Sequence, residues 1–524
     1  MPRLPRSLPL VVAVLGAAPA FSADQPQWGT AWSRNLVSAE RGLPATFDVA
    51  TGRNVKWVAA LGTESHSTPV IADGRVFIGT NNGEPRDPRH PGDRGVVMCF
   101  SERDGSLLWQ LVVPKREEDP YFDWPKCGIS STVTVEGDRA YVLDNRGVVL
   151  CLDVRGLADG NAGPFRDEAA YFTPRRNSGA APRAVAGAAI QPEPGLRPLD
   201  REPVQLGPLD ADIVWAFDLV AQAGTWPHDA ACSSILILGD YLYVNTSTGV
   251  DNTHRKIHTP DAPSLVVIDK RTGRYVARDR EGIAPAIFHA TWSSPAAAVV
   301  NGEPRIVFAG GNGIVYGFKP ITGAPETAAP RTLEKTFQYD LDPSSPKDGV
   351  HRFTQNRREG PSNIYGMPVV LDGRMYVAGG GDVFWGKNAA WLKCVDLTRA
   401  NVGAGPTEVW SYPLVQHTLT TAAVVDGLVF ATDTAKNVHC VDAVTGKPYW
   451  THPCGGLFWA SPYVADGKVY VGTRTGEFWV FAAEREKRVL FQHTFPEKIS
   501  ATVTAANGVI YIGTMTHLYA IAAR

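Results

Sequence analysis

Short runs of β-branched and aromatic residues recur along the whole chain, and most of them follow an Asp-Gly or Asn-Gly pair. Eight such runs are present, at residues 75–80, 139–144, 241–246, 305–310, 374–379, 428–433, 468–473 and 509–514. Glycine-containing pairs between apolar runs are typical of tight β-hairpin turns. Each run has one apolar segment before it and another after it, and a fourth segment often carries a tryptophan. The pattern predicts repeated four-stranded units.

The spacing of the turns indicates the architecture. The last three turns, at Asp426, Asp466 and Asn507, lie 40 and 41 residues apart, and loops fill the longer spacings earlier in the chain. Four-stranded units at this period are typical of propeller blades. Stacked helical repeats would show a 3.6-residue period, which we do not see. We therefore predict an all-β fold, an eight-bladed β-propeller of four-stranded antiparallel blades.

The last unit is incomplete, because the chain ends after its third strand. A matching segment stands near the N-terminus, where residues 48–58 align with residues 442–450 and Trp57 takes the place of Trp450. An open ring would leave unpaired strand edges. We therefore expect an N-terminal strand to complete the eighth blade, so that residues 24–524 form a single β-propeller domain.

Composition narrows the function classes. The formal net charge is −2, which argues against a nucleic-acid footprint. Arg3 and Arg6 precede an apolar run that is too short to span a bilayer, and small residues follow it, so residues 1–23 predict a signal peptide. We expect a periplasmic or secreted monomer with no membrane span and no nucleic-acid partner.

Several motifs resemble those of a known family. The Asp-x-x-Thr-Gly-x-x-x-Trp pattern at 442–450 is similar to the tryptophan-docking repeats of quinoprotein propellers. The whole mature chain resembles exported PQQ-binding-like β-propeller repeat proteins through Trp28-Gly29, Arg34-Asn35, 92–95, 123–125, 226–228 and 292–295. The resemblance implies the fold, whereas the activity stays open because this fold hosts both dehydrogenases and binding scaffolds.

Long loops and histidines gather on one face of the predicted ring. The long loops are of two kinds, from each outer strand to the next blade and from second to third strands, and in a propeller both kinds share one face. Loops on a rigid scaffold commonly carry function. We expect a ligand pocket at the mouth of the central funnel, lined by His66, His228, Cys232, His289, Trp292, Tyr365, His417 and Trp459. The alternative is that these side chains merely fill the channel.

Two functions follow from the resemblance. In the first, which we favour, the protein is a binding or scaffold module whose ligand is a protein, a glycan or a small molecule. In the second, it is a PQQ-dependent dehydrogenase of alcohols or sugars, with PQQ and Ca²⁺ as cofactors. Trp292 or Trp459 would then be the stacking floor and Arg357 or Arg358 would meet a PQQ carboxylate. The family's adjacent cysteines and a matching catalytic acid are missing from this sequence.

Other motifs argue against further chemistry. His254 and His258 are four residues apart, but Arg255 stands where a zinc protease needs Glu, so we expect a solvated loop and no metal site. Residues 160–210 predict an irregular insertion in blade two, on the plainer face, which is the one opposite the long loops. Cys99, Cys151, Cys394 and Cys440 fall in third strands too far apart to pair. Cys127–Cys232 is the one disulfide that we consider.

Overall fold

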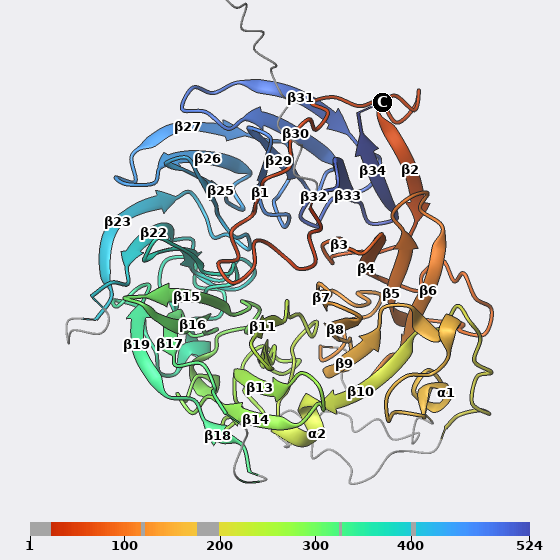
Figure 1. The fold of residues 1–524 in the computed structure, drawn as a ribbon. Coiled ribbons are helices and arrows are strands. Elements are labelled where there is room, and N and C mark those ends of the chain that lie inside the picture. Colours follow the sequence, from red (N-terminus) through yellow and green to blue (C-terminus); the bar gives the residue numbers. More distant parts are fainter. Residues whose placement is uncertain are drawn as a thin grey trace, which may run out of the picture.

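In a computed structural model, eight sheets stand around a central axis (Figure 1). The structure describes residues 23–116, 121–175, 199–323, 327, 329–399 and 405–523, so the predicted signal peptide lies almost entirely outside the described residues. No helix in this part of the chain is long and apolar enough to cross a membrane. The predicted all-β, eight-bladed propeller is confirmed.

The first four blades follow the chain from its inner to its outer strand. Their strands are β3 (Val70–Ala72), β4 (Arg75–Asn81), β5 (Arg94–Ser101) and β6 (Leu107–Pro114); β7 (Thr134–Glu136), β8 (Arg139–Leu143), β9 (Val148–Asp153) and β10 (Asp212–Asp218); β11 (Leu236–Leu238), β12 (Tyr241–Asn245), β13 (Leu265–Asp269) and β14 (Tyr275–Arg278), extended by β18 (Arg331–Thr332); and β15 (Ala296–Val300), β16 (Glu303–Ala309), β17 (Ile314–Phe318) and β19 (Lys335–Asp340).

The other four blades repeat this order, with two additions from the N-terminus. Their strands are β20 (Val369–Leu371), β21 (Arg374–Gly380), β22 (Ala390–Asp396) and β23 (Thr407–Leu414); β24 (Ala423–Val425), β25 (Leu428–Thr432), β26 (Asn437–Asp442) and β27 (Pro448–Pro453); β1 (Val37–Ser38), β28 (Tyr463–Ala465), β29 (Lys468–Gly472), β30 (Glu477–Ala482) and β31 (Val489–Thr494); and β32 (Thr504–Ala506), β33 (Val509–Gly513), β34 (His517–Ala522) and β2 (Val55–Ala60).

Helices are short and lie outside the sheets. Within the described residues they comprise α1 (Glu168–Tyr171), α2 (Leu219–Ala223) and three 3-10 turns, η1 (Gly156–Asp159), η2 (Ala284–Ala286) and η3 (Val350–Phe353). The middle strands of each blade are buried on both faces because neighbouring blades pack against them. In β9, for example, every residue is buried. This two-sided burial explains why these strands appear in the sequence as continuous apolar runs.

The predicted closure of the ring is confirmed. Strand β2 pairs antiparallel with β34, with Val58 opposite Tyr519, and so supplies the fourth strand of the last blade. The indole Nε1 of Trp57 donates to the Glu102 carbonyl in the first blade, 3.0 Å away. The two ends of the chain are therefore joined in one sheet, and that sheet docks on the next blade.

Tryptophan docking joins several neighbouring blades. Trp410 Nε1 donates to the Ala443 carbonyl at 3.1 Å, and its ring lies on Gly446 of the next blade. A Cβ on Gly446 would stand 2.6 Å from the Trp410 ring, and this residue has a φ of +71°. Glycine is therefore required at this turn both for its backbone conformation and for the ring that covers it.

We expect Gly446→Ala to destabilise the protein more than Gly427→Ala does. Both glycines have a positive φ, but a Cβ on Gly427 would meet nothing within 4 Å. The backbone penalty is common to both variants and cancels in the comparison. The steric clash with Trp410 should therefore leave a difference of about 1–3 kcal/mol in the free energy of unfolding. Chemical denaturation of the two variants measures this difference, and equal stabilities would contradict the docking role of the turn.

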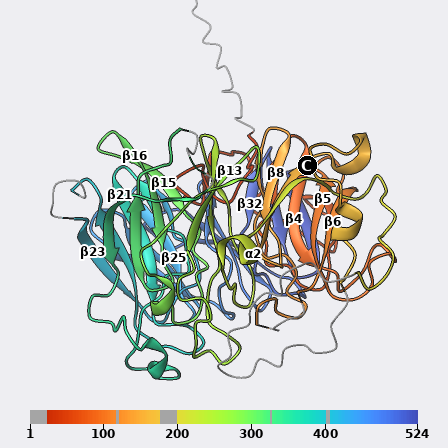
Figure 2. The ribbon, with the colours of Figure 1, turned by 90° about the horizontal axis from the view of Figure 1, so that it is seen from below.

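A segment that we did not anticipate closes one end of the channel. Residues 25–40, here called the plug, cross the centre of the ring (Figure 1) and lie at one end of the blades, while long loops extend from the other end (Figure 2). Carbonyl groups of the plug accept backbone N–H groups of innermost strands from Ile71, Val135, Ala297, Val370 and Val464. The plug thus pairs with blade after blade around the ring.

Polar side chains of the plug reach the remaining blades. Asn35 exchanges two hydrogen bonds with the backbone of Val424, at 2.7 and 2.9 Å. Glu40 accepts from the backbone N–H groups of Asn507 and Gly508. The guanidinium of Arg34 is fully buried and donates to the carbonyl groups of Ser234 and Pro295 at 2.8 and 2.9 Å. The Arg34-Asn35 motif is therefore part of the fold.

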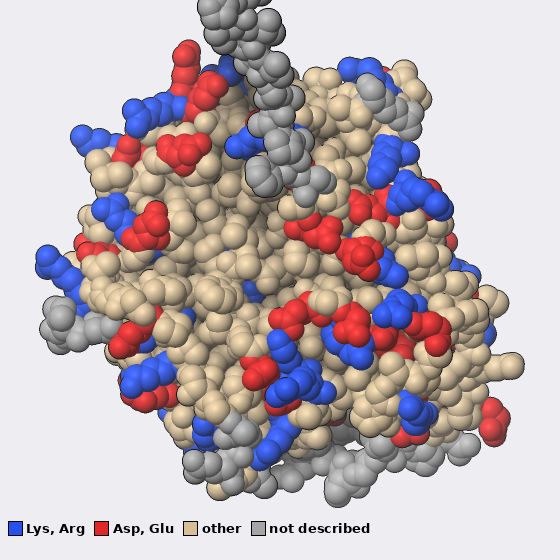
Figure 3. All heavy atoms as spheres, in the orientation of Figure 1, with Lys and Arg blue, Asp and Glu red and all other residues tan. Residues whose placement is uncertain are grey.

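Among the described residues, the face that carries the plug shows no patch of one charge. Lys, Arg, Asp and Glu are mixed over its rim and right-hand side, whereas much of the centre and left is uncharged (Figure 3). A nucleic-acid-binding face would be expected to gather basic side chains.

The described parts of the insertion correct our expectation for its position. Tyr171 donates a hydrogen bond to Asp144, in the turn between β8 and β9, and the Arg146 guanidinium lies 4.3 Å from its ring centroid. That turn is on the face with the long loops. The insertion starts at the opposite end, where Ala162 N–H donates to Asp212, so the expectation that it lies on that face holds only for its first residues. Residues 176–198 lie outside the described residues. A connection of this length can run the full height of the blade, beside strand β10, where Phe165 N–H donates to the Val214 carbonyl.

Candidate functional site

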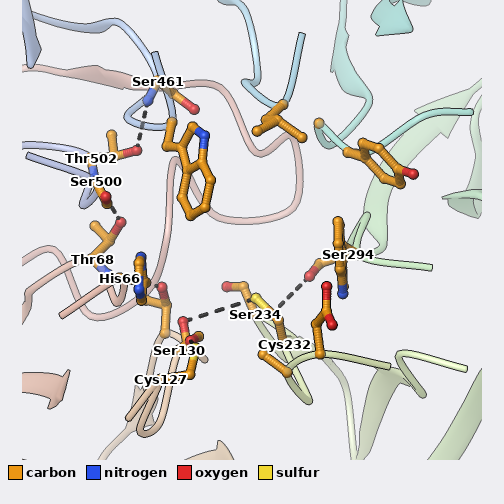
Figure 4. Close-up of a pocket in the computed structure, with 18 of the residues that line it drawn as sticks. His66, Thr68, Cys127, Ser130, Cys232, Ser234, Ser294, Ser461, Ser500 and Thr502 are labelled. Carbon is orange, nitrogen blue, oxygen red and sulfur yellow. Dashed lines mark hydrogen bonds between the residues drawn. The ribbon is translucent and has the colours of Figure 1, made fainter. Parts of the chain in front are cut away.

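A cavity of about 660 Å³ opens at the centre of the ring, on the face with the long loops. Trp28 of the plug contributes to its lining, and the other lining residues come from connections that enter innermost strands and from loops between second and third strands. Part of this cavity is drawn in Figure 4. Its volume is within the range of small-molecule sites.

Six of the eight predicted site residues line this cavity: His66, Cys232, His289, Trp292, Tyr365 and Trp459. The other two stand behind the wall. The His228 ring lies 4.8 Å from the His289 ring, and the His417 ring lies 5.2 Å from the Tyr365 ring. Position in the fold was thus predicted well, whereas a role in binding stays a prediction.

A belt of hydroxyl groups fixes the inner wall. At six of the eight blade interfaces, the backbone N–H of one blade donates to a Ser or Thr hydroxyl of the next. These bonds run from Thr68 to Thr132, Ser234 to Ser294, Met367 to Thr421, Thr421 to Ser461, Ser461 to Thr502 and Thr502 to Thr68. Figure 4 shows the bonds that join Ser234 to Ser294 and Ser461 to Thr502. These bonds satisfy backbone groups that would otherwise be unpaired at the funnel. The wall is therefore held in place without side chains that would fill the cavity.

One side of the cavity combines an indole with a cation. The Arg474 guanidinium lies 4.0 Å from the centroid of the Trp459 ring, and the His66 ring is 5.6 Å from the same indole. Arg474 donates to Ser500 Oγ at 2.6 Å. Among the described residues no carboxylate lies within ion-pair distance of it, but the Glu64 carboxylate, which also lines the cavity, interacts with it electrostatically. We had not identified Arg474, because a single arginine in a short turn gives no sequence signal.

Three imidazoles meet on another side of the cavity. The ligand-capable ring nitrogens of His228, His254 and His289 all lie within 4.8 Å of one another. The carboxylate of Asp229 stands beside two of them, 3.4 Å from His228 Nε2 and 3.7 Å from His289 Nε2. Our expectation that the 254–258 segment is a solvated loop was wrong, since His254 lies in this cluster and only 5% of the His258 side chain is exposed.

Hydrogen bonds behind the cluster fix the orientation of two rings. His228 Nδ1 is 2.7 Å from the Val250 carbonyl, and His289 Nδ1 is 3.0 Å from the Asp382 carboxylate. Asp382 is fully buried and also accepts from the Tyr365 hydroxyl at 2.6 Å. Each Nδ1–H is therefore engaged, which leaves the Nε2 atom of both rings to face the cluster.

Burial controls the charge of this cluster. It lowers the pKa of His254 to about 4, and it lowers the pKa of His228, which stands beside two other imidazoles, well below the usual value. Burial acts on His289 in the same direction, but the Asp382 carboxylate outweighs it and raises the pKa. Burial also raises the pKa of Asp229 to about 6. Two of the three imidazoles are therefore neutral at pH 7 and carry a free lone pair.

A second cluster contains Asp87, His90 and Asp210 and is organised differently. The guanidinium of Arg89 forms ion pairs with both carboxylates, including one of 2.9 Å to Asp210. An arginine already neutralises these two groups, so the cluster is an ordinary ion-pair network rather than a vacant set of ligands.

All seven cysteines have free thiols, including Cys127 and Cys232, for which we had considered a disulfide. Both of them line the cavity. Burial raises the pKa of Cys127 to about 11 and that of Cys232 to about 12, so both are protonated at neutral pH. Protonated thiols are poor nucleophiles.

We expect seven thiols per chain to react with a thiol reagent in denatured, unreduced protein. In the native protein, Cys127 and Cys232 should react slowly at pH 7, because the thiolate is the reactive form. A count of five would indicate the Cys127–Cys232 bond, and a count of three or fewer would contradict the geometry of the third strands.

The residues of the cavity do not fit PQQ with Ca²⁺. Arg357 donates to the carbonyl groups of Gly386 and Phe384 and so holds a loop, Arg358 is exposed, and neither lines the cavity. Ca²⁺ prefers six to eight oxygen ligands. The carboxylates in the lining are Glu64 and Asp229, and imidazoles surround the latter. The donor set therefore favours nitrogen-binding metals over Ca²⁺.

Comparisons with known proteins agree with the fold. A family model described as outer membrane protein assembly factor BamB matches residues 398–521. No curated protein matches the chain in sequence. BamB from Moraxella catarrhalis is similar in structure, with a TM-score of 0.51 and 12% identity over 88% of this chain and 98% of that one.

A dehydrogenase shows the same architecture. A europium-containing methanol dehydrogenase is similar with a TM-score of 0.59 and 10% identity, over 95% of this chain and 98% of that one. Likeness at such low identity establishes the fold alone. This chain is therefore an eight-bladed β-propeller, similar in fold to both a BamB protein and a methanol dehydrogenase.

Proposed function

We propose that this protein is a binding module that takes a small organic molecule, with a flat apolar body and one acidic group, into the cavity at the funnel mouth. The observation that carries the proposal is the wall made by Trp459 and Arg474, in which a guanidinium lies over one face of an indole and forms no ion pair with a carboxylate of the described residues. An indole face binds flat apolar groups, and a guanidinium binds carboxylates or sulfonates.

The rest of the lining supports the same class of ligand. Trp28, Trp124, Trp292 and Phe384 supply further apolar surface, and the hydroxyl belt supplies fixed polar atoms. Small-molecule sites typically combine a largely apolar wall with a few oriented polar groups. A scaffold that bound a large partner would be expected to present a broad exposed surface instead of an enclosed cavity.

Fluorescence of anilinonaphthalene sulfonate tests the proposal, because this probe is aromatic and carries one anionic group. We expect saturable binding of one probe per chain. Trp459→Ala and Arg474→Gln should each weaken binding by about tenfold or more, since about 1.4 kcal/mol of lost contact corresponds to a tenfold change in Kd.

Trp32→Ala is the matched control, because Trp32 is 48% exposed and lies outside the cavity lining. It should leave the probe's affinity unchanged. Binding that does not saturate, or that is insensitive to Trp459→Ala and Arg474→Gln, would contradict the proposed site.

A further inference from the structure

We propose that His228, His254 and His289 form a binding site for a divalent transition metal ion of the Zn²⁺ or Cu²⁺ class. This inference goes beyond the proposed function, because neither the fold nor an organic ligand requires a metal. The three residues come from separate loops, before β11, between β12 and β13 and before β15, yet their ring nitrogens lie within 4.8 Å of one another.

Two of the ring nitrogens form no hydrogen bond within the described part of the chain and have the Asp229 carboxylate as their nearest charged group. His228 Nε2 and His289 Nε2 are buried and have no hydrogen-bond partner among the described residues. Buried polar atoms are nearly always paired, and a buried atom without a partner calls for an explanation such as a bound ion. Both atoms belong to side chains that are at most 2% exposed, and both approach the same Asp229 carboxylate.

The spacing of the ring nitrogens has to contract for the three histidines to bind a metal together. Zinc–nitrogen bonds of about 2.0–2.1 Å in a tetrahedron place ligand nitrogens about 3.3 Å apart. The observed spacing of up to 4.8 Å would have to shorten by about 1.5 Å to reach that value. The His254 residue is on a loop and partly exposed, so its ring can make most of this adjustment.

Two histidines of the triad (His228, His254 and His289) have hydrogen-bond partners of the kind found behind metal-binding histidines. His289 donates through Nδ1 to the buried Asp382 carboxylate, and His228 Nδ1 is 2.7 Å from the Val250 carbonyl. Such partners set the tautomer and raise the affinity of the ligand nitrogen. Three imidazoles suit Zn²⁺ and Cu²⁺, whereas Ca²⁺ and Mg²⁺ prefer oxygen ligands.

The position of the triad indicates what a bound metal would do. His254, His289 and Asp229 line the cavity, so a metal with three histidine ligands would have an open position or Asp229 as its fourth ligand. An open position is typical of metal sites that bind or activate another molecule. An oxygen or nitrogen atom of the cavity's occupant could then coordinate the metal, and this last step rests on the proposed function.

Metal titration of tag-free, chelator-treated full-length protein tests the site directly. With Zn²⁺ or Cu²⁺ as the probe, calorimetry should give one tightly bound ion per chain. His254→Gln, which changes a partly exposed residue and leaves the core intact, should weaken binding by more than about 100-fold. Asp382→Asn should weaken it by about 10–100-fold, as expected for a group that orients a ligand.

His258→Gln is the matched control, since it alters a histidine of the same loop that lies outside the triad. It should leave metal affinity unchanged. Absence of stoichiometric binding, or equal affinities of the native protein and His254→Gln, would overturn the proposal. Bound Co²⁺ should also give the visible absorption of a four-coordinate, nitrogen-rich site, and His254→Gln should abolish it.

The same samples separate this inference from the proposed function. The fluorescent probe is titrated in the presence of chelator, so its binding does not depend on metal. Probe binding without metal binding would reject the triad alone, and metal binding without probe binding would reject the organic-ligand site alone.

Discussion

A chain that lacks residues 24–60 is expected to lose cooperative thermal unfolding. The deletion removes strand β2 and the whole plug, including the buried side chains of Trp28, Leu36, Phe47 and Trp57. Burial of a large apolar side chain contributes about 1.5–3 kcal/mol, so the loss is on the order of 10 kcal/mol. That is comparable with the whole stability of a typical domain, about 5–15 kcal/mol.

Thermal melting followed by circular dichroism measures this effect. The edge of β34 would be left unpaired, so aggregation on heating is also expected. A synthetic peptide of residues 24–60 should restore the transition when it is added back to the truncated chain. A truncated protein that melts within a few degrees of the full-length protein would contradict closure by the N-terminal segment.

Arg34→Met is expected to destabilise the protein by at least about 3 kcal/mol. The guanidinium donates to the Ser234, Pro295 and Trp28 carbonyl groups, and methionine fills similar space without a donor. Each buried acceptor that loses its partner costs about 1–3 kcal/mol. Because Trp28 lines the cavity, the affinity for the fluorescent probe should fall as well.

Arg41→Met serves as the control for this prediction, because Arg41 belongs to the same N-terminal segment but is exposed. Exposed substitutions usually change stability by less than about 0.5 kcal/mol. Chemical denaturation of both variants measures the difference. Similar stabilities of Arg34→Met and Arg41→Met would show that the buried guanidinium does not hold the plug.

The blades could be predicted from the sequence because each one repeats the same local signal. An Asp-Gly or Asn-Gly turn between apolar runs specifies a hairpin within a few residues, and Trp57 shows through its spacing that it completes the last unit. The plug gave no such signal. Residues 25–36 contribute mostly backbone carbonyl groups to strands that are distant in sequence, and backbone acceptors leave no pattern in side chains.

The candidate site was predicted only in part, for a similar reason. Residues just before innermost strands, such as His66 and His289, could be located because the repeat fixes their position. His254 and Arg474 lie in loops between second and third strands, whose shapes the repeat does not specify. The four-residue spacing of His254 and His258 suggests a pair within one loop. The histidines that meet come instead from three different loops.

The most direct test of the cavity as the binding site is a crystal structure with 4-iodobenzoate, a flat ring with one carboxylate and a strong anomalous scatterer. We expect one dominant iodine peak inside the funnel mouth, with the ring against Trp459 and the carboxylate within ion-pair distance of Arg474. Iodine peaks confined to the outer surface or to the plug face, with an empty cavity, would contradict the proposal that the cavity is the binding site.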